Sequence, residues 1–201
     1  MKVSLIIPCF NEAFGIGKTY ERLLAWYSES KNLGVEALEI VFVNDGSSDN
    51  TPSILKGFEG NGDGVSVVVG GFEFNRGRGA ALREGFVLST GDLVIALDAD
   101  LSYDESHITR ILQAFKENPG ADIVVVSAYM KGGSNSGVPW RRLLVSRIAN
   151  WILARFLHRS LRTVTCVVRG RECCFGRLAE GGHEPGREDA GRVFSRGAIV
   201  G

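Results

Sequence analysis

The sequence predicts one α/β domain, with a three-layer α/β/α architecture and a mostly parallel sheet. The chain has 201 residues, of which 44% are hydrophobic and 23% are charged. This length and composition suit a single domain with a sizeable core and exclude a wholly disordered chain. Up to about residue 130, short apolar runs typical of buried strands alternate with segments of helical periodicity. Polar motifs follow directly after several of the apolar runs.

The expected elements follow in order along the chain. Apolar runs predict strands at residues 3–8, 39–43, 65–69, 93–97 and 123–126. Helices are expected at residues 17–30, from a start at 47–52, at 80–88 and at 105–117. Strands separated by helices indicate βαβ units. Ligands of such sheets bind beyond the carboxyl ends of the strands.

The distribution of charge changes near residue 138. Residues 1–137 hold 11 basic and 18 acidic residues, whereas residues 138–201 hold 12 basic and 5 acidic residues. A nucleic-acid partner is not expected, because the total charge is zero. Residues 140–162 predict a cationic amphipathic helix that suits a membrane surface or a lipid phosphate. The alternative is a helix that packs on the sheet with its arginine side chains turned outward.

The cysteines and the apolar runs bear on location. Cys9, Cys166, Cys173 and Cys174 form no CxxC pair and no plausible set of disulfides. Without an amino-terminal signal peptide, they are expected to be reduced thiols of a cytoplasmic protein. No apolar run reaches the roughly 18–20 residues that span a bilayer. The expected location is therefore the cytoplasm, peripheral at the cytoplasmic face of the membrane.

Asp98 and Asp100, directly after the fourth expected strand, are the sharpest chemical signal. Two carboxylates one residue apart at a strand end can share a divalent cation with the diphosphate of a ligand. Mg²⁺ or Mn²⁺ would then neutralise charge that develops on a departing diphosphate. A pair of exposed turn acids has the same spacing, but the position directly after a buried strand favours the metal site.

Two other strand ends carry polar motifs. Asp45 beside Gly46 can accept a hydrogen bond from a nucleobase, although a helix N-cap region explains the same residues equally well. Asn75-Arg76-Gly77-Arg78-Gly79 is a glycine-rich turn before a helix. Its backbone amides and two guanidinium groups could hold phosphate or ribose.

Two other enzyme classes share part of this pattern. A dinucleotide-binding GxGxxG needs a third glycine where this chain has Leu82, and it follows the first strand rather than the third. The nucleophile loop of the haloacid-dehalogenase phosphatases is similar to Asp98-x-Asp100-x-Ser102. Those enzymes carry the loop on their first strand and need a later lysine, whereas no lysine follows Lys131 here. Both classes are therefore disfavoured.

Four motifs occur in order along the chain, at residues 3–12 (VSLIIPCFNE), 43–51 (VNDGSSDNT), 75–81 (NRGRGAA) and 98–100 (DAD). Together they resemble the family 2 glycosyltransferases of the GT-A fold. Within that family the chain is most similar to the dolichyl- or polyprenyl-phosphate mannosyl- and glucosyltransferases. Support for this branch comes from residues 131–133, Trp140-Arg141-Arg142, Ser146, Asn150 and residues 165–172. The resemblance covers roughly residues 1–173.

The resemblance implies a fold, an activity and a set of site residues. The fold would be that of a Rossmann-like nucleotide-diphospho-sugar transferase. The activity would be metal-assisted, inverting transfer of a hexose (mannose or glucose) from a GDP- or UDP-hexose to polyprenyl or dolichyl phosphate. The nucleotide-sugar site would comprise Pro8, Phe10, Asn11, Glu12, Asp45, Gly46, Asn75, Arg76 and Gly77. The catalytic residues would be Asp98 and Asp100, which bind Mg²⁺ or Mn²⁺, and Arg141, Arg142 and Arg169, which face phosphate groups.

No catalytic base is expected, because a phosphate acceptor is already anionic and needs positioning and charge neutralisation. The sequence also departs from the family. Ser102 stands where the branch often has Gln, and Ala128 stands where many members have Arg. Two alternatives stay open: a truncated nucleotide-sugar-binding remnant with little transfer activity, and a family 2 transferase that acts on a glycan.

The carboxyl-terminal segment departs furthest from the family. The expected catalytic domain spans residues 1–172, with an incomplete carboxyl-terminal part, and residues 173–201 form an atypical Gly/Arg-rich tail. We interpret this tail, as a hypothesis, as frameshifted or disordered, because pattern and resemblance stop together. Resequencing the DNA around codons 170–176 tests the frameshift, and an intact frame with the same stop would refute it.

Overall fold

The computed structural model describes residues 1–101, 105–121, 123–126, 166–170 and 197–200. The strands are β1 (Lys2–Cys9), β2 (Ala37–Asp45), β3 (Gly60–Gly62), β4 (Val65–Phe72), β5 (Leu93–Ala96), β6 (Ile123–Val126), β7 (Cys166–Gly170) and β8 (Gly197–Val200). The helices are α1 (Ile16–Glu29), the short 3₁₀ helix η1 (Ser30–Leu33), α2 (Thr51–Phe58), α3 (Arg78–Leu88) and α4 (Ser106–Glu117). The described strands form one sheet in the order β3-β4-β2-β1-β5-β7-β6-β8.

Four neighbouring strands, β4, β2, β1 and β5, form a continuous parallel block of the sheet. β1 pairs in parallel with β2 and with β5, and β2 pairs in parallel with β4. The carboxyl ends of these strands therefore reach the same edge, where the segments that follow them meet. The structure confirms the predicted α/β class and the mostly parallel sheet, and it contains a strand at each predicted apolar run.

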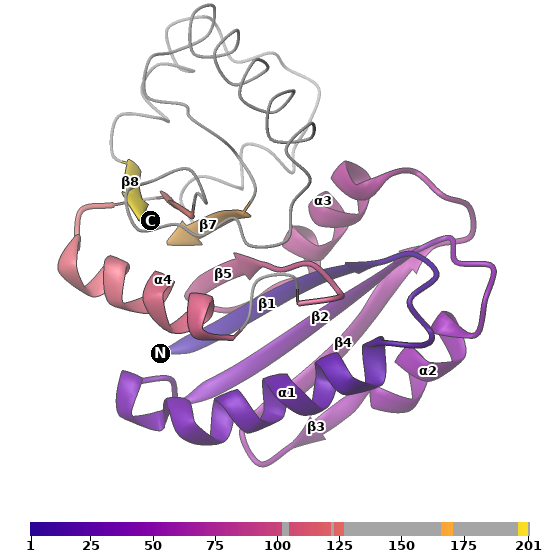
Figure 1. Cartoon of the computed structure of the whole chain (residues 1–201), viewed down its shortest axis with the longest axis horizontal. Coiled ribbons are helices and arrows are strands. Elements are labelled where there is room, and N and C mark those ends of the chain that lie inside the picture. The colour runs from indigo at the N-terminus through magenta and orange to yellow at the C-terminus, as the bar shows by residue number, and fades with distance from the viewer. Residues whose placement is uncertain (102–104, 122, 127–165, 171–196, 201) are drawn as a thin grey trace, which may run out of the picture.

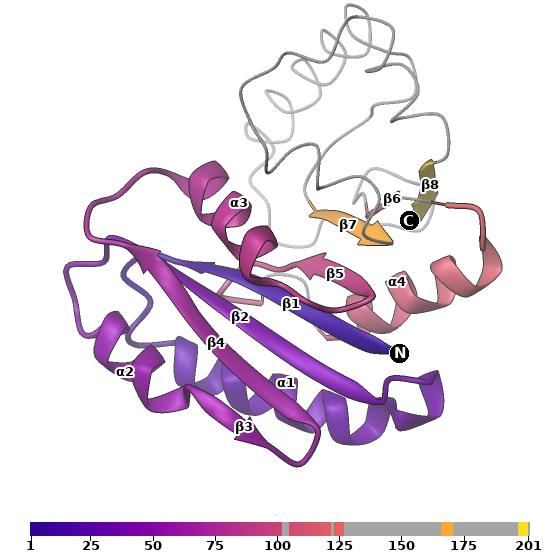
Figure 2. The ribbon, with the colours of Figure 1, turned by 180° about the vertical axis from the view of Figure 1, so that it is seen from behind.

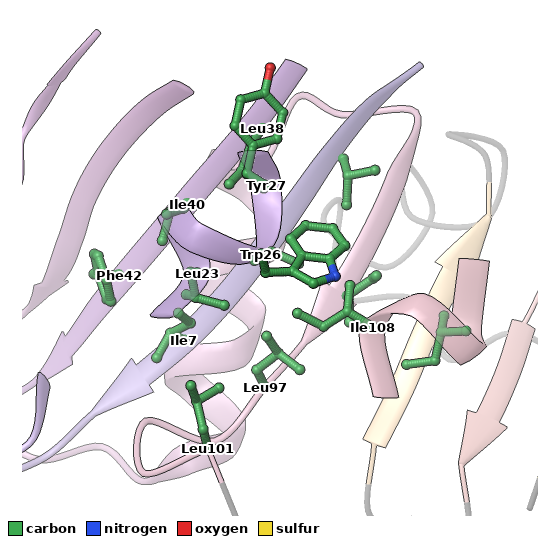
Figure 3. Packing of buried hydrophobic residues seen from close by; sticks show 14 of the residues in the cluster. Ile7, Leu23, Trp26, Tyr27, Leu38, Ile40, Phe42, Leu97, Leu101 and Ile108 are labelled. Atoms are coloured by element: carbon green, nitrogen blue, oxygen red, sulfur yellow. The ribbon is translucent and has the colours of Figure 1, made fainter. Parts of the chain in front are cut away.

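Helices cover both faces of the sheet, which produces three layers (Figures 1 and 2). The larger core lies under α1, α2 and α4, and a smaller core lies under α3. Because side chains alternate along a strand, Leu5 and Ile7 of β1 join the larger core, whereas Ile6 joins the smaller one. Figure 3 shows Leu23 and Trp26 of α1 among the residues of the larger core. β1 is thus buried on both faces, which explains its continuous apolar run.

Three strands of the structure are not predicted by the sequence pattern. β3 pairs antiparallel with β4 at the sheet edge, and its residues are exposed, so no apolar period marks it. β7 pairs antiparallel with both β5 and β6, and β8 pairs in parallel with β6. These pairings join segments far apart in the chain, which a local pattern cannot encode.

The predicted cationic helix at residues 140–162, with Arg141 and Arg142, lies outside the described residues. Ser102 and Ala128, the two departures from the family pattern, also lie outside them. Within the part of the chain that the structure describes, no helix is long and apolar enough to cross a membrane.

Candidate functional site

A cavity of about 380 Å³ opens at the carboxyl edge of the parallel strands. Its walls come from the ends of β1 and β2, the turn between β4 and α3, and the turn after β5. The lining residues are Pro8, Cys9, Phe10, Glu12, Asp45, Asn75, Gly77, Arg78, Asp98, Ala99 and Asp100. The structure thus brings most of the predicted site residues to one cavity from four separate segments of the chain.

The cavity is rich in carboxylates. Glu12, Asp45, Asp98 and Asp100 contribute acidic side chains, and Arg78 is the only base among the described residues that line it. Burial, together with the charges of Asp100 and Asp49, raises the pKa of Glu12. Glu12 and Asp100 therefore repel each other across the cavity, and a ligand that includes a cation would relieve this repulsion.

The Asp98–Asp100 turn is held in place by the protein core. The hydroxyl of Thr19, on α1, donates a hydrogen bond to the backbone oxygen of Ala99 at 2.6 Å. The backbone N–H of Leu101 donates to the backbone oxygen of Asp98 at 3.0 Å, and Leu101 has a φ of +45°. Ala99 and Leu101 are buried, whereas Asp98 is half-buried and Asp100 is exposed. Apolar residues thus anchor the turn while both aspartates line the cavity.

Asp98 forms an ion pair across the cavity wall. Nη2 of Arg78, the first residue of α3, lies 2.5 Å from Oδ1 of Asp98. The Arg78 and Asp98 side chains are 50% and 35% exposed, respectively. The ion pair therefore remains accessible to a ligand that enters the cavity.

Asp45 lies at the end of β2, and its side chain is 3% exposed. The backbone N–H of Arg76 donates a hydrogen bond to its Oδ1 at 2.8 Å. The next residue, Gly46, has a φ of +68°, and a Cβ there would lie 2.3 Å from the backbone nitrogen of Asn75. Only glycine fits this contact. Gly46 and Arg76 are not lining residues of the cavity, but they hold Asp45 and Asn75 together in its wall.

The segment after β1 is bonded to the segment after β2. The backbone N–H of Asn11 donates to Oγ of Ser47 at 3.0 Å, and the backbone N–H of Ser48 donates to Oδ1 of Asn11 at 2.8 Å. The backbone N–H of Glu12 donates to Oγ1 of Thr51 at 2.8 Å. Asn11 adopts a left-handed φ of +58° and is not a lining residue. Its side chain joins the two segments, a role that the sequence motif alone does not reveal.

Cys9 and Ala99 also line the cavity; both lie within the motifs at residues 3–12 and 98–100, but the sequence assigns neither a role. The Cys9 side chain is 1% exposed, and its S–H donates to the backbone oxygen of Ile7 at 3.4 Å. Burial, followed by the charge of Glu12, raises the pKa of Cys9 to about 12. Cys9 therefore stays a neutral thiol and is a poor nucleophile.

Two arginines of the predicted motifs lie on different elements, Arg78 at the start of α3 and Arg169 on β7. Arg78 belongs to the glycine-rich motif at residues 75–79, which leads into α3. This position brings Arg78 to the cavity wall. Arg169 lies on β7, paired with Val94 of β5 and Ile123 of β6. The backbone register is all that the structure describes of Arg169.

Asp98 and Asp100 are the residues that could hold a divalent cation. Within the described ranges, no group of three or more His, Cys, Asp or Glu side chains has a metal-binding arrangement. Two carboxylates, completed by waters and the phosphate oxygens of a ligand, are the donor set that Mg²⁺ prefers. The residues present therefore fit a cation that binds together with a phosphate-bearing ligand.

The chain is similar in sequence to known proteins. Residues 4–178 match the family model described as Glycosyl transferase family 2. The chain is 33% identical over 168 residues to the undecaprenyl-phosphate 4-deoxy-4-formamido-L-arabinose transferase of Serratia proteamaculans (strain 568), covering 84% of this chain and 48% of that protein. It is 32% identical over 167 residues to the protein of the same name from Edwardsiella ictaluri (strain 93-146), covering 83% and 48%. The chain thus spans about half the length of the curated relatives that it matches.

Solved structures are similar in fold. The complex of S. aureus TarS 1-349 with UDP-GlcNAc has a TM-score of 0.50 and 26% identity, covering 69% of this chain and 37% of that one. The mannosyltransferase PcManGT from Pyrobaculum calidifontis, in complex with GDP-Man and Mn²⁺, has a TM-score of 0.57 and 20% identity, covering 88% and 46%. These similarities confirm the predicted nucleotide-diphospho-sugar transferase (GT-A) fold.

Proposed function

The chain belongs to glycosyl transferase family 2, and we propose that it transfers a sugar from a nucleotide-diphosphate sugar to a polyprenyl phosphate. The observation that carries this proposal is the single cavity that collects Asp45, Asp98 and Asp100 from separate strand ends. The names of the curated relatives support the polyprenyl phosphate acceptor. The UDP-GlcNAc complex of the similar TarS structure supports a nucleotide-sugar donor.

The donor would lie along the carboxyl edge of the sheet. We assign the buried Asp45 carboxylate to the base, with Pro8, Phe10 and Asn75 beside it in the cavity. Asp98 and Asp100 would hold the Mg²⁺ or Mn²⁺, which when bound supplies charge neutralisation for the diphosphate leaving group. The role of these carboxylates would be to hold that positive charge for the diphosphate.

The acceptor would be an anionic lipid phosphate, which is already a nucleophile at neutral pH. The protein therefore needs to position the acceptor and offset its charge rather than remove a proton. We propose Arg141, Arg142 and Arg169 for this role, and we propose that residues 140–162 bring the chain to the cytoplasmic surface of the membrane. A basic segment near an anionic surface gains about 1 kcal/mol per Lys or Arg.

The most specific part of the proposal is the identity of the transferred sugar. The resemblance in sequence implies mannose or glucose on GDP or UDP, with inversion. The curated relatives are named for 4-deoxy-4-formamido-L-arabinose instead. A panel of GDP-mannose, UDP-glucose and the UDP-activated formamido-arabinose, each with undecaprenyl phosphate, distinguishes these donors.

The test of the function is turnover of such donors with undecaprenyl phosphate and Mg²⁺ or Mn²⁺. Asp98→Asn and Asp100→Asn should each lower the rate by about 100-fold or more, because each removes charge stabilisation at the leaving group. Asp63→Asn is the matched control, since Asp63 is exposed and does not line the cavity. Unchanged turnover in both Asp98→Asn and Asp100→Asn, or full turnover in EDTA, would contradict the metal assignment.

A second candidate function is nucleotide-sugar binding with little transfer. The observation that favours it is that the described lining residues of the cavity all fall within residues 8–100, the part proposed to hold the donor. Titration calorimetry with UDP- and GDP-sugars separates the two functions. Donor binding without transfer to any lipid phosphate would favour the binding protein.

A further inference from the structure

Arg78 carries a positive charge in a cavity that is lined by several carboxylates. Among the described lining residues it is the one base against Glu12, Asp45, Asp98 and Asp100. Its guanidinium is paired with Asp98 at 2.5 Å, and Asp98 is one of the two carboxylates proposed to hold the cation. The Asp98 carboxylate therefore pairs with the Arg78 guanidinium when the donor is absent.

The Arg78–Asp98 ion pair is exposed enough for a ligand to replace one of its partners. Both side chains are accessible, with the Arg78 side chain 50% exposed, and ion pairs between exposed side chains contribute little to stability. Arg78 is the first residue of α3 and follows a glycine-rich turn, so its long side chain starts at the cavity wall. A diphosphate offers a guanidinium several oxygens in a geometry that allows two parallel hydrogen bonds, which is a stronger partner than one exposed carboxylate oxygen.

The ion pair opposes a divalent cation that arrives alone. Such a cation would meet the positive charge of Arg78 at Asp98 and would find Oδ1 already engaged. A diphosphate that arrives with the cation removes both obstacles, because it attracts the guanidinium away from Asp98 and contributes oxygens to the cation. Binding of one partner then favours binding of the other, and this coupling is reciprocal.

We propose that Arg78 exchanges between Asp98 in the donor-free chain and the diphosphate of the bound donor, and thereby couples cation binding to donor binding. The inference rests on the proposed function, because it concerns the same donor site. Arg78 keeps Asp98 neutralised until the nucleotide diphosphate arrives. The chain would then bind the cation weakly without nucleotide.

The experiment compares wild type with Arg78→Ala in two titrations of the full chain. The first measures Mn²⁺ alone by electron paramagnetic resonance, and the second measures UDP, then GDP, by calorimetry at saturating Mn²⁺. We expect Arg78→Ala to bind Mn²⁺ alone at least about fivefold tighter, and to bind the nucleotide with Mn²⁺ at least about fivefold more weakly. These opposite signs separate an exchange from structural damage, which would weaken both.

Two further variants sharpen the comparison. Arg78→Lys keeps the charge, so it should bind Mn²⁺ alone as wild type does, but it lacks the planar fork and should recover only part of the nucleotide affinity. Arg83→Ala removes a charge from an exposed position of the same helix that does not line the cavity, and should match wild type in both titrations. Thermal unfolding of each variant within about 2 °C of wild type shows that the fold is intact.

The outcomes distinguish the coupling from the proposed function. If the chain binds UDP or GDP and Arg78→Ala binds Mn²⁺ alone no tighter than wild type, the coupling is overturned and the function stands. If wild type binds neither nucleotide in the presence of Mn²⁺, the donor site and the coupling are both overturned.

Discussion

At the scale of single residues, Glu12 is a cavity carboxylate whose pKa is raised by its surroundings. Burial and the charges of Asp100 and Asp49 raise its pKa above the usual 4.5. The folded chain therefore binds a proton more tightly than the unfolded chain, and stability falls as the pH rises from 4.5 through the raised pKa. We expect Glu12→Gln to raise the melting temperature at pH 7 and to have a smaller effect at pH 4. Scanning calorimetry at the two pH values measures the difference.

Asp49, on the neighbouring segment, has a pKa shifted in the opposite direction. Hydrogen bonds from Thr51, led by its side chain, lower the pKa of Asp49 below the usual 3.8. Its contribution to stability is therefore present above that value and is lost as the pH falls through the lowered pKa. Asp49→Asn should lower the melting temperature at pH 7. A rise at pH 7 for Asp49→Asn, or a fall for Glu12→Gln, would contradict the assigned electrostatics.

At the scale of elements, the contact between the end of β2 and the turn before α3 determines the shape of the cavity. Gly46 has a φ of +68°, and an added Cβ would lie 2.3 Å from the backbone nitrogen of Asn75 and 2.4 Å from the carbonyl carbon of Phe74. Gly46→Ala should therefore push these segments apart, cost roughly 2 kcal/mol of folding free energy and weaken UDP or GDP binding. Urea unfolding and calorimetry measure the two effects.

Gly57 in α2 is the matched control for this substitution. A Cβ at Gly57 has nothing within 4 Å, and alanine is a better helix former than glycine by up to about 1 kcal/mol. Gly57→Ala should thus leave nucleotide binding unchanged and be neutral or stabilising. Equal nucleotide affinities for Gly46→Ala and wild type would show that the contact does not shape the site.

The elements also show what the sequence can predict. β1, β2 and β5 are buried on both faces, so their residues form apolar runs that identify them directly. The polar residues that follow them reach one edge because the strands are parallel, and this places Asp45 and Asp98 correctly. The position of β7 between β5 and β6 depends on pairing between distant segments. The same limit applies to the bonds of Asn11 with Ser47 and Ser48, which no local pattern encodes.

At the scale of the whole molecule, the total charge is neutral because an acidic part and a basic part of the chain cancel each other. Residues 1–137 hold 18 acidic against 11 basic residues, and four of these acids line the cavity. They are Glu12, Asp45, Asp98 and Asp100. Such a cavity disfavours a bare anionic ligand and suits a nucleotide diphosphate that carries its own divalent cation. The basic residues after position 138 supply the opposite charge that an anionic lipid acceptor would need.

β8 (Gly197–Val200) lies at one end of the strand order of the sheet. The described lining residues of the cavity come from β1, β2 and the segments that follow β1, β4 and β5. β8 pairs in parallel with β6, in the register Ile123 with Gly197. β8 belongs to residues 173–201, which the sequence pattern predicts to be an atypical tail. Whether β8 stabilises the fold therefore calls for a direct measurement.

Deletion of residues 197–201 provides that measurement. It would leave the backbone N–H and C=O groups of one side of β6 unpaired along an Ile-Val-Val-Val strand, and such edges promote association between molecules. We expect a lower melting temperature, by about 2–4 °C for each kcal/mol lost, and larger species in sedimentation. UDP or GDP binding should persist, because the cavity residues stay in place. An unchanged melting temperature would show that β8 adds no stability, as a frameshifted tail would be expected to behave. Loss of nucleotide binding by a deletion variant that still folds would show instead that the cavity depends on the far edge of the sheet.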